Sequence, residues 1–158
     1  MTALWPLPDL AATDRLGSAL ARSCPWDERQ ARVLYLSGEL GAGKTTLAAA
    51  LLRELGVDEP VRSPSYMLVE LYEVHGLCAL HVDLYRLTDP DELEQLGLRD
   101  YLNARTLLLI EWPEKGGKAV PPADLHIHLA TQPARVANLL AASASGEAWL
   151  TAARGQQR

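Results

Sequence analysis

The chain has 158 residues, enough for one domain that buries about two-thirds of the surface its unfolded chain would expose. Hydrophobic residues make up 48% of it and charged residues 22%, a balance that excludes disorder as the general state. The formal net charge of −5 argues against a surface that neutralises nucleic-acid phosphates by itself, so a partner is expected to hold any nucleic acid.

Cysteine usage and the distribution of apolar residues predict a cytoplasmic protein. Cys24 and Cys78 form no C-x-x-C pair, which indicates neither a zinc site nor a redox motif. No apolar run reaches membrane-spanning length, and the chain does not open with a basic region followed by an apolar core. We therefore expect no membrane partner and a single domain over residues 1–158, with 1–11 and 154–158 peripheral or frayed.

The first part of the chain predicts a surface lead-in, a helix and a buried strand. Residues 1–10 carry two prolines, which favour an irregular surface segment. Thr13 is expected to cap a helix that runs to about Ser23, because apolar residues then recur at helical spacing. A loop over 24–30 leads to residues 33–37, whose short apolar run suits a buried strand.

Residues 38–46, G-E-L-G-A-G-K-T-T, contain the phosphate-loop pattern G-x-x-x-x-G-K-[ST]. They follow the predicted strand and precede a helix-forming run over 47–55 that stops at Gly56, which is the context the pattern requires. Glycines let backbone N–H groups curl around phosphates, and a helix N-terminus adds partial positive charge. Lys44 is then expected to reach the β- and γ-phosphates, and the Thr45 hydroxyl to ligate Mg²⁺.

The next segment predicts a nucleotide sensor and an antiparallel hairpin. Residues 61–66 form a proline-punctuated polar stretch at the place where many phosphate-loop proteins sense the γ-phosphate. Residues 67–74 and 77–84 predict two antiparallel strands joined by a turn at His75 and Gly76. One face of the second strand presents an imidazole, a carboxylate and a phenol, from His81, Asp83 and Tyr85.

The remaining elements complete an α/β pattern. Asp89 and Pro90 predict the start of a short helix that breaks near Gly97, and the apolar run over 106–110 predicts a buried strand that ends at Glu111. Two closing strands over 125–130 and 135–142 and a final helix over 146–153, capped by Ser145, follow. This order predicts a single P-loop NTPase domain with a mixed parallel and antiparallel sheet flanked by helices, and with the nucleotide at the carboxyl ends of its strands.

Two carboxylates compete for the metal-binding role opposite the phosphate loop. Glu111 ends the more apolar strand, so we assign it to Mg²⁺ and leave Asp83 to orient or activate the attacking water, or to bind the ion through water. His81 stays open between a histidine of the core or surface and a catalytic one. Tyr85 and Arg86 are candidates for contact with the nucleotide or a partner, or for packing, and Arg86 is the local candidate for a charge-stabilising arginine.

Missing motifs argue against other nucleotide-dependent classes. The pattern D-x-x-G occurs only at 14–17, before the phosphate loop, and N-K-x-D is absent, so guanine specificity of the Ras type is not expected. No arginine cluster comparable to a kinase lid lies between the predicted strands, which leaves a small-molecule kinase as a minor alternative.

Taken together, these motifs resemble those of one family, the bacterial tRNA threonylcarbamoyladenosine biosynthesis ATPases known as TsaE or YjeE. The resemblance covers about residues 12–152. It is carried by the phosphate loop, S-P-S-Y at 63–66, H-V-D-L-Y-R at 81–86 and I-E-W-P-E at 110–114, in the family's order and spacing. The phosphate loop alone is shared with a very large superfamily, and the H-x-D-x-Y-R and I-E-W elements make the match specific.

This resemblance implies a Mg²⁺-dependent ATPase that works with two partner proteins, TsaB and TsaD. The second of these transfers threonylcarbamoyl to adenosine 37 of tRNA, so the chain is expected to meet tRNA only through the complex. It is further expected to hydrolyse ATP slowly alone, faster with its partners, and to reset the complex between turnovers. The main alternative is a nucleotide-gated assembly adaptor whose hydrolysis is incidental.

The resemblance also implies roles for individual residues. Lys44 and Asp83 are expected to be catalytic, and Thr45 and Glu111 to ligate Mg²⁺. The residues expected to contact ATP are Glu39, Leu40, Gly41, Ala42, Gly43, Lys44, Thr45, Thr46 and Trp112. The candidates for partner contact or nucleotide switching are Ser63, Ser65, His81, Tyr85 and Arg86. Ser65 stands where the family usually has threonine, so a hydroxyl group remains without the methyl group.

Overall fold

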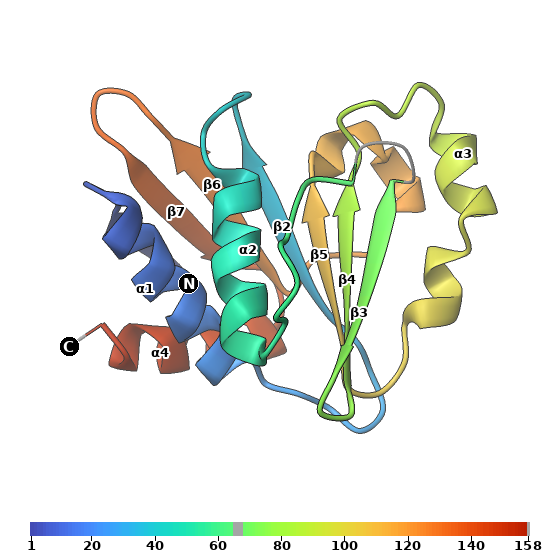
Figure 1. Ribbon diagram of the computed structural model, residues 1–158, viewed down its shortest axis with the longest axis horizontal. Helices are drawn as coiled ribbons and strands as arrows, with labels where there is room; N and C mark the ends of the chain where they lie inside the picture. The colour runs from blue at the N-terminus through green and yellow to red at the C-terminus, as the bar shows by residue number, and fades with distance from the viewer. Residues whose placement is uncertain (65–67, 158) are drawn as a thin grey trace.

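A seven-stranded sheet organises the part of the chain that the computed structural model describes, residues 1–64 and 68–157 (Figure 1). The strands are β1 (Thr2–Pro6), β2 (Arg32–Gly38), β3 (Val69–Val74), β4 (Leu77–Asp83), β5 (Thr106–Glu111), β6 (Leu125–Ala130) and β7 (Val136–Ala141). The α-helices are α1 (Leu10–Ser23), α2 (Lys44–Leu55), α3 (Pro90–Gln95) and α4 (Ala144–Gly155). Short 3₁₀ turns occupy η1 (Leu98–Tyr101), η2 (Pro113–Lys115) and η3 (Gly117–Ala119).

The sheet is mixed, and its parallel strands bring the functional motifs to one edge. The strand order is β1-β7-β6-β2-β5-β4-β3. Strand β2 runs parallel to both β5 and β6, and β4 runs parallel to β5, whereas the outer pairs are antiparallel. The carboxyl ends of β2, β4 and β5 therefore meet, which is where an open α/β sheet binds its ligand. The predicted α/β fold with a mixed, helix-flanked sheet is confirmed.

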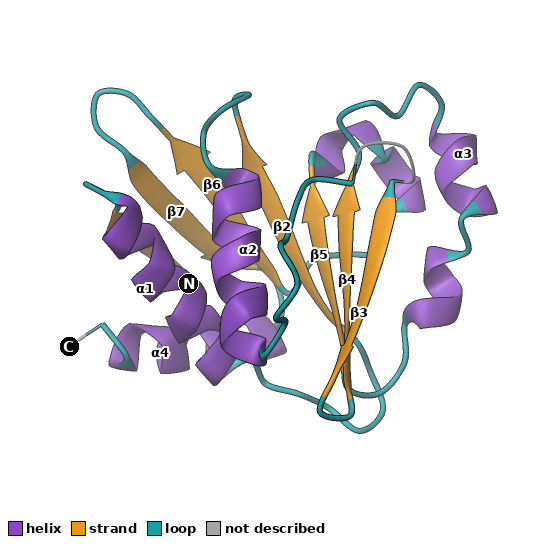
Figure 2. Ribbon diagram, viewed as in Figure 1, coloured by secondary structure: helices purple, strands orange, loops and turns teal. Residues whose placement is uncertain are grey.

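Two apolar clusters lie on opposite faces of the sheet. Along β5, Leu107 and Leu109 belong to the cluster beneath α1, α2 and α4, and Leu108 and Ile110 belong to the cluster beneath α3 and the 3₁₀ turns. This strand is buried at every position, as the continuous apolar run predicts. Figure 2 shows α1, α2 and α4 grouped on one side of the molecule, apart from α3. No helix in the described part of the chain combines the length and the apolar character needed to cross a bilayer.

The N-terminal segment differs from the predicted surface lead-in. Residues Thr2–Pro6 form the edge strand β1, antiparallel to β7, and the Trp5 side chain is buried. A proline is tolerated here because an edge strand has one side without ladder partners. Helix α1 also begins earlier than expected, at Leu10, because the Asp9 carboxylate accepts a hydrogen bond from the Ala12 N–H at 2.8 Å and so replaces Thr13 as the cap.

Two other element boundaries shift for similar local reasons. Helix α4 is capped by Ser143, which accepts a hydrogen bond from the Gly146 N–H at 3.0 Å, so the helix starts before Ser145 and continues to Gly155. Strand β4 ends at Asp83, so Tyr85 lies in a turn and does not share a strand face with His81 and Asp83.

Candidate functional site

The phosphate loop turns where β2 meets α2, and glycine is required at both of its ends. Gly38 has a φ of 141°, and a Cβ atom added there would lie 2.5 Å from the Leu129 carbonyl oxygen on β6. Gly43 caps α2 with a φ of 105°. Both conformations are unfavourable for residues with a side chain. The sequence therefore fixes a tight loop whose amides and helix N-terminus face the same space.

Lys44 lies almost wholly buried in this loop. Its Nζ donates to the carbonyl oxygens of Gly38 and Glu39 at 2.7 and 2.8 Å, and lies 4.3 Å from the centre of the Trp112 ring. Burial lowers the pKa of Lys44, and the carboxylates of Glu111 and Asp83 oppose that shift. The ammonium group is thus surrounded by acceptors and an aromatic face at the position where a γ-phosphate would provide stronger ones.

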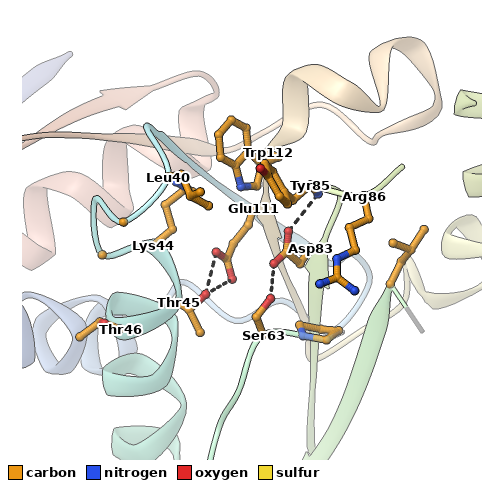
Figure 3. A pocket seen from close by; sticks show the side chains of 14 residues that line it. Leu40, Lys44, Thr45, Thr46, Ser63, Asp83, Tyr85, Arg86, Glu111 and Trp112 are labelled. Atoms are coloured by element: carbon orange, nitrogen blue, oxygen red, sulfur yellow. Dashed lines mark hydrogen bonds between the residues drawn. The ribbon is translucent and has the colours of Figure 1, made fainter. Parts of the chain in front are cut away.

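Thr45 and Glu111 meet across the gap between α2 and β5. The Thr45 hydroxyl donates to both oxygens of the Glu111 carboxylate, at 2.9 Å to Oε1 and 3.0 Å to Oε2 (Figure 3). Hydroxyl and carboxylate oxygens are ligands that Mg²⁺ prefers, usually together with substrate phosphates and water. Within residues 1–64 and 68–157, no three His, Cys, Asp or Glu side chains converge to hold a metal by themselves. The donor set fits a cation shared with a nucleotide.

Asp83 lies on the neighbouring strand, directly opposite Glu111 in the sheet register. Its Oδ2 accepts a hydrogen bond from the Ser63 hydroxyl, and its Oδ1 accepts one from the Tyr85 N–H at 3.0 Å. Figure 3 shows the guanidinium of Arg86 directed toward Asp83 and Ser63. The structure thus brings Ser63 of the predicted sensor segment, the second carboxylate and the candidate arginine to one wall of the site.

A cavity of about 450 Å³ lies between these groups. Its lining residues are Leu40, Gly41, Gly43, Lys44, Thr45, Thr46, Ser63, Pro64, Leu68, Asp83, Tyr85, Arg86, Glu111 and Trp112. Most of the side chains that the sequence singles out are therefore brought together. Ser65 lies outside the described residues. His81 is fully buried beneath Glu111 and does not line the cavity.

Two aromatic rings close one side of the cavity. Tyr85 and Trp112 have ring centres 5.1 Å apart, and the Nζ of Lys115 lies 4.9 Å from the Tyr85 ring centre. Lys115 also donates to the Tyr85 carbonyl oxygen at 2.8 Å. Trp112 adopts a left-handed backbone conformation with a φ of 57°, which is uncommon for a bulky residue. Sequence reasoning did not assign Lys115 a role, because only the fold brings it to these rings.

A second, smaller cavity of about 40 Å³ lies on the other side of the phosphate loop. It is lined by Leu7, Leu10, Thr13, Ala42, Gly43, Thr46, Leu129, Ala130 and Arg135. Leu10 is 72% exposed at the start of α1, although most leucines of the chain are buried. Sequence analysis expected Ala42, Gly43 and Thr46 to contact ATP but gave no site role to the residues from α1, β6 and the segment that follows β6, since their proximity to the loop depends on β6 lying next to β2 in the sheet.

Comparison with protein families and known proteins gives a consistent result. The family model described as "Threonylcarbamoyl adenosine biosynthesis protein TsaE" matches residues 7–137. A Haemophilus influenzae protein named tRNA threonylcarbamoyladenosine biosynthesis protein TsaE is 49% identical over 100 residues, 63% of either chain. A Synechocystis protein of the same name is 38% identical over 113 residues, 69% of either chain. The chain thus spans about two-thirds of the length of these relatives.

Among solved structures, the crystal structure of Bacillus subtilis YdiB is similar to this fold. The TM-score is 0.81 at 23% sequence identity, and the match covers 100% of this chain and 97% of the other. At that level of identity the likeness concerns the fold alone.

Proposed function

The chain belongs to the TsaE family, and on this premise we propose that it is the ATP-binding and ATP-hydrolysing component of the bacterial tRNA N6-threonylcarbamoyladenosine machinery. In this proposal it works with the proteins TsaB and TsaD and resets their complex between turnovers. It meets tRNA only through that complex, which agrees with its net charge of −5. The same role puts it in the cytoplasm, where bacterial tRNA is modified.

One observation carries the proposal: the phosphate-loop lysine, the adjacent hydroxyl and two strand-end carboxylates face one cavity. Lys44 and Thr45 come from the start of α2, whereas Asp83 and Glu111 end neighbouring parallel strands. This is the arrangement that phosphoryl transfer from ATP needs, because catalysis there consists mostly of positioning and charge stabilisation.

The contacts suggest how each residue would act on ATP. Lys44 would exchange the carbonyl oxygens of Gly38 and Glu39 for the β- and γ-phosphates, gaining charge-assisted hydrogen bonds. Thr45 and Glu111 would hold Mg²⁺, which when bound would neutralise charge that develops on the phosphates. Asp83 would orient the attacking water after the Ser63 hydroxyl leaves its Oδ2.

The surface around the smaller cavity is the proposed docking place of the adenine base, because the cavity itself, at about 40 Å³, is too small to enclose a purine. It adjoins Gly43 and Thr46, so a nucleotide with its phosphates in the loop would extend toward it. The exposed Leu10 side chain provides an apolar surface for a base, and the Arg135 guanidinium lies close to Gly43. Leu10→Ser is therefore expected to weaken ATP binding more than binding of inorganic triphosphate, as measured by calorimetry.

Phosphate release tests the proposed function directly. The purified chain is incubated with ATP and Mg²⁺, alone and with TsaB and TsaD from the same organism. We expect slow release alone and marked stimulation by the pair, lost in Lys44→Ala. Equal rates with and without partners, despite complex formation shown by gel filtration, would contradict partner-activated hydrolysis.

A nucleotide-gated adaptor is the second candidate, and the state of Asp83 favours it. Both carboxylate oxygens of Asp83 are engaged by the chain itself, one by Ser63 and one by the Tyr85 N–H. A carboxylate that ties two segments together could serve assembly and not hydrolysis. Asp83→Asn separates the two, since an adaptor would still bind ATP and support many rounds of tRNA modification without hydrolysing it.

A further inference from the structure

The His81 imidazole lies beneath Glu111 in the interior of the protein. His81 is 0% exposed and lies on β4, two residues before Asp83, so the two side chains are on the same face of the sheet. Its Nε2 lies 2.5 Å from Oε2 of Glu111, which is 2% exposed. The sheet register pairs His81 with Leu109 and Asp83 with Glu111, so the imidazole reaches Glu111 diagonally from the neighbouring strand.

The surroundings of Nδ1 show which residue donates the hydrogen in the contact between His81 and Glu111. Within the described residues, Nδ1 of His81 is buried and has no hydrogen-bond partner. A neutral ring with its proton on Nε2 leaves only a lone pair unpaired, whereas a proton on Nδ1 would bury an unsatisfied N–H. His81 therefore donates through Nε2 to the Glu111 carboxylate.

The Glu111 carboxylate accepts hydrogen bonds from two side chains. Its Oε2 accepts from both His81 and the Thr45 hydroxyl, whereas its Oε1 has only the Thr45 contact. The hydrogen bonds from His81 and Thr45 together fix the orientation of the Glu111 carboxylate, and Glu111 lines the cavity described above.

We propose that His81 is a positioning residue that fixes the Glu111 carboxylate for Mg²⁺. This inference rests on the proposed function and assigns His81 a role that sequence reasoning left open. Hydrogen bonds from groups behind a metal ligand set its orientation and basicity, and their loss costs about 10-fold to 100-fold in metal affinity. The alternative is a buried polar pair that only stabilises the fold.

A pair of amide variants separates these roles. The amide nitrogen of glutamine in His81→Gln lies near the position of Nε2, whereas the shorter asparagine in His81→Asn does not reach Glu111. Calorimetry of ADP binding over a range of Mg²⁺ concentrations, and again in EDTA, gives the metal dependence without turnover. His128→Asn serves as the control, since His128 lies on β6 and contacts Ser37.

We expect His81→Asn to raise the Mg²⁺ concentration for half-maximal enhancement of ADP binding about 10-fold or more, with ADP affinity in EDTA unchanged. His81→Gln should recover most of the loss, and His128→Asn should match the wild type. Metal dependence in His81→Asn equal to that of the wild type would overturn the positioning role. If His81→Asn lowers ADP affinity equally with Mg²⁺ and in EDTA, the positioning role is also overturned, because that pattern indicates a role only in the fold.

Histidine nitrogen NMR of the wild-type protein provides a test that needs no variant to fold. Long-range ¹H–¹⁵N spectra should show His81 as the Nε2–H tautomer, with its Nε2 resonance shifting when Mg²⁺ and ADP are added together. The Nδ1–H tautomer, or no shift while ADP binding depends on Mg²⁺, would overturn this proposal alone. ADP binding by the wild type without any Mg²⁺ dependence would instead overturn the proposed metal site, and His81 positioning with it.

Discussion

The polar side chains of the site form hydrogen bonds with other groups of the protein. Lys44 donates to two loop carbonyls, Thr45 donates to Glu111, and Ser63 donates to Asp83. Each neutral hydrogen bond contributes about 1 kcal/mol net, and bonds to charged groups contribute about 1.5–3 kcal/mol. In the proposed function, a nucleotide would replace these contacts with stronger ones, so its measured affinity would be the difference between the hydrogen bonds of the empty site and those of the occupied site.

At the scale of single residues, substitution of Lys44 tests its proposed phosphate-binding role. Lys44→Met keeps most of the side-chain volume but removes the ammonium group. The empty protein should stay folded, with a free energy of unfolding lower by up to about 3 kcal/mol, because the bonds from Nζ to the carbonyl oxygens of Gly38 and Glu39 are lost. Binding of Mg²⁺-ATP should weaken about 10-fold to 100-fold or more, because at least one charge-assisted bond is lost. Calorimetry measures the affinity and urea unfolding measures the stability. An affinity equal to that of the wild type would contradict the phosphate role of Lys44.

A second residue-scale prediction concerns pH. Burial lowers the pKa of His126, and the neighbouring His128 lowers it further, while Glu114 opposes the shift. The unfolded chain therefore binds a proton more readily, so His126 reduces the free energy of unfolding as the pH falls through about 6.5. Above that pH the effect is absent. Urea unfolding at pH 5.5 and 7.5 should show a smaller loss on acidification in His126→Gln than in the wild type; equal losses would refute the assignment.

At the scale of elements, the two helices beside the phosphate loop pack unusually closely. A Cβ atom added at Gly17 of α1 would lie 2.5 Å from the Ala50 Cβ and 2.8 Å from the Leu51 nitrogen of α2. Because Leu51 contributes a backbone atom, the contact cannot relax by a change of rotamer. Helix α2, which begins at the end of the phosphate loop, is thus held at a fixed distance from α1.

We therefore expect Gly17→Ala to lower the free energy of unfolding by about 1–3 kcal/mol, despite the higher helix propensity of alanine. Gly155→Ala in α4 is the matched control, since nothing lies within 4 Å of a Cβ atom there. The control should change stability by less than about 1 kcal/mol. Denaturant unfolding of both variants checks the pair, and equal effects would show that the helices separate at little cost.

The elements also show what local sequence signals can and cannot predict. The phosphate loop, the strand that ends at Glu111 and the hairpin turn at His75 and Gly76 depend on nearby residues, and they were predicted correctly. The strand β1 was missed because its pairing with β7 is non-local and because Pro6 at its end and Pro8 beyond it favour an irregular segment. Leu10 and Arg135 were missed at the site because only the sheet order makes them neighbours.

At the scale of the whole molecule, one face of the sheet carries polar and apolar side chains along four neighbouring strands. The outward positions of β1, β7, β6 and β2 carry Thr2, Leu4, Asn138, Leu140, His126, His128, Tyr35 and Ser37. Leu4 and Leu140 are 63% and 48% exposed. Glu39 and Glu114 border this face, since they line one cavity with Ser37, His126 and His128.

Nucleotide binding should stabilise the molecule as a whole if the site is formed before the ligand arrives. A ligand at 100 times its dissociation constant adds about 2.7 kcal/mol to the free energy of unfolding. Thermal unfolding with Mg²⁺-ADP should therefore shift upward by several degrees in the wild type and by much less in Glu111→Gln. An equal shift in both proteins would show that Glu111 does not take part in binding.

Strand β2 lies between the parallel strands β5 and β6, so the two groups of site residues lie on opposite sides of it. On one side, β5 carries Glu111 and lies next to β4 with Asp83; on the other, β6 leads into the connection with Arg135. In the proposed function, substitutions between β6 and β7 would alter which base is preferred while Lys44, Thr45 and Glu111 stay the same. Preference for a nucleotide and the rate of its hydrolysis would then be free to change independently among related proteins.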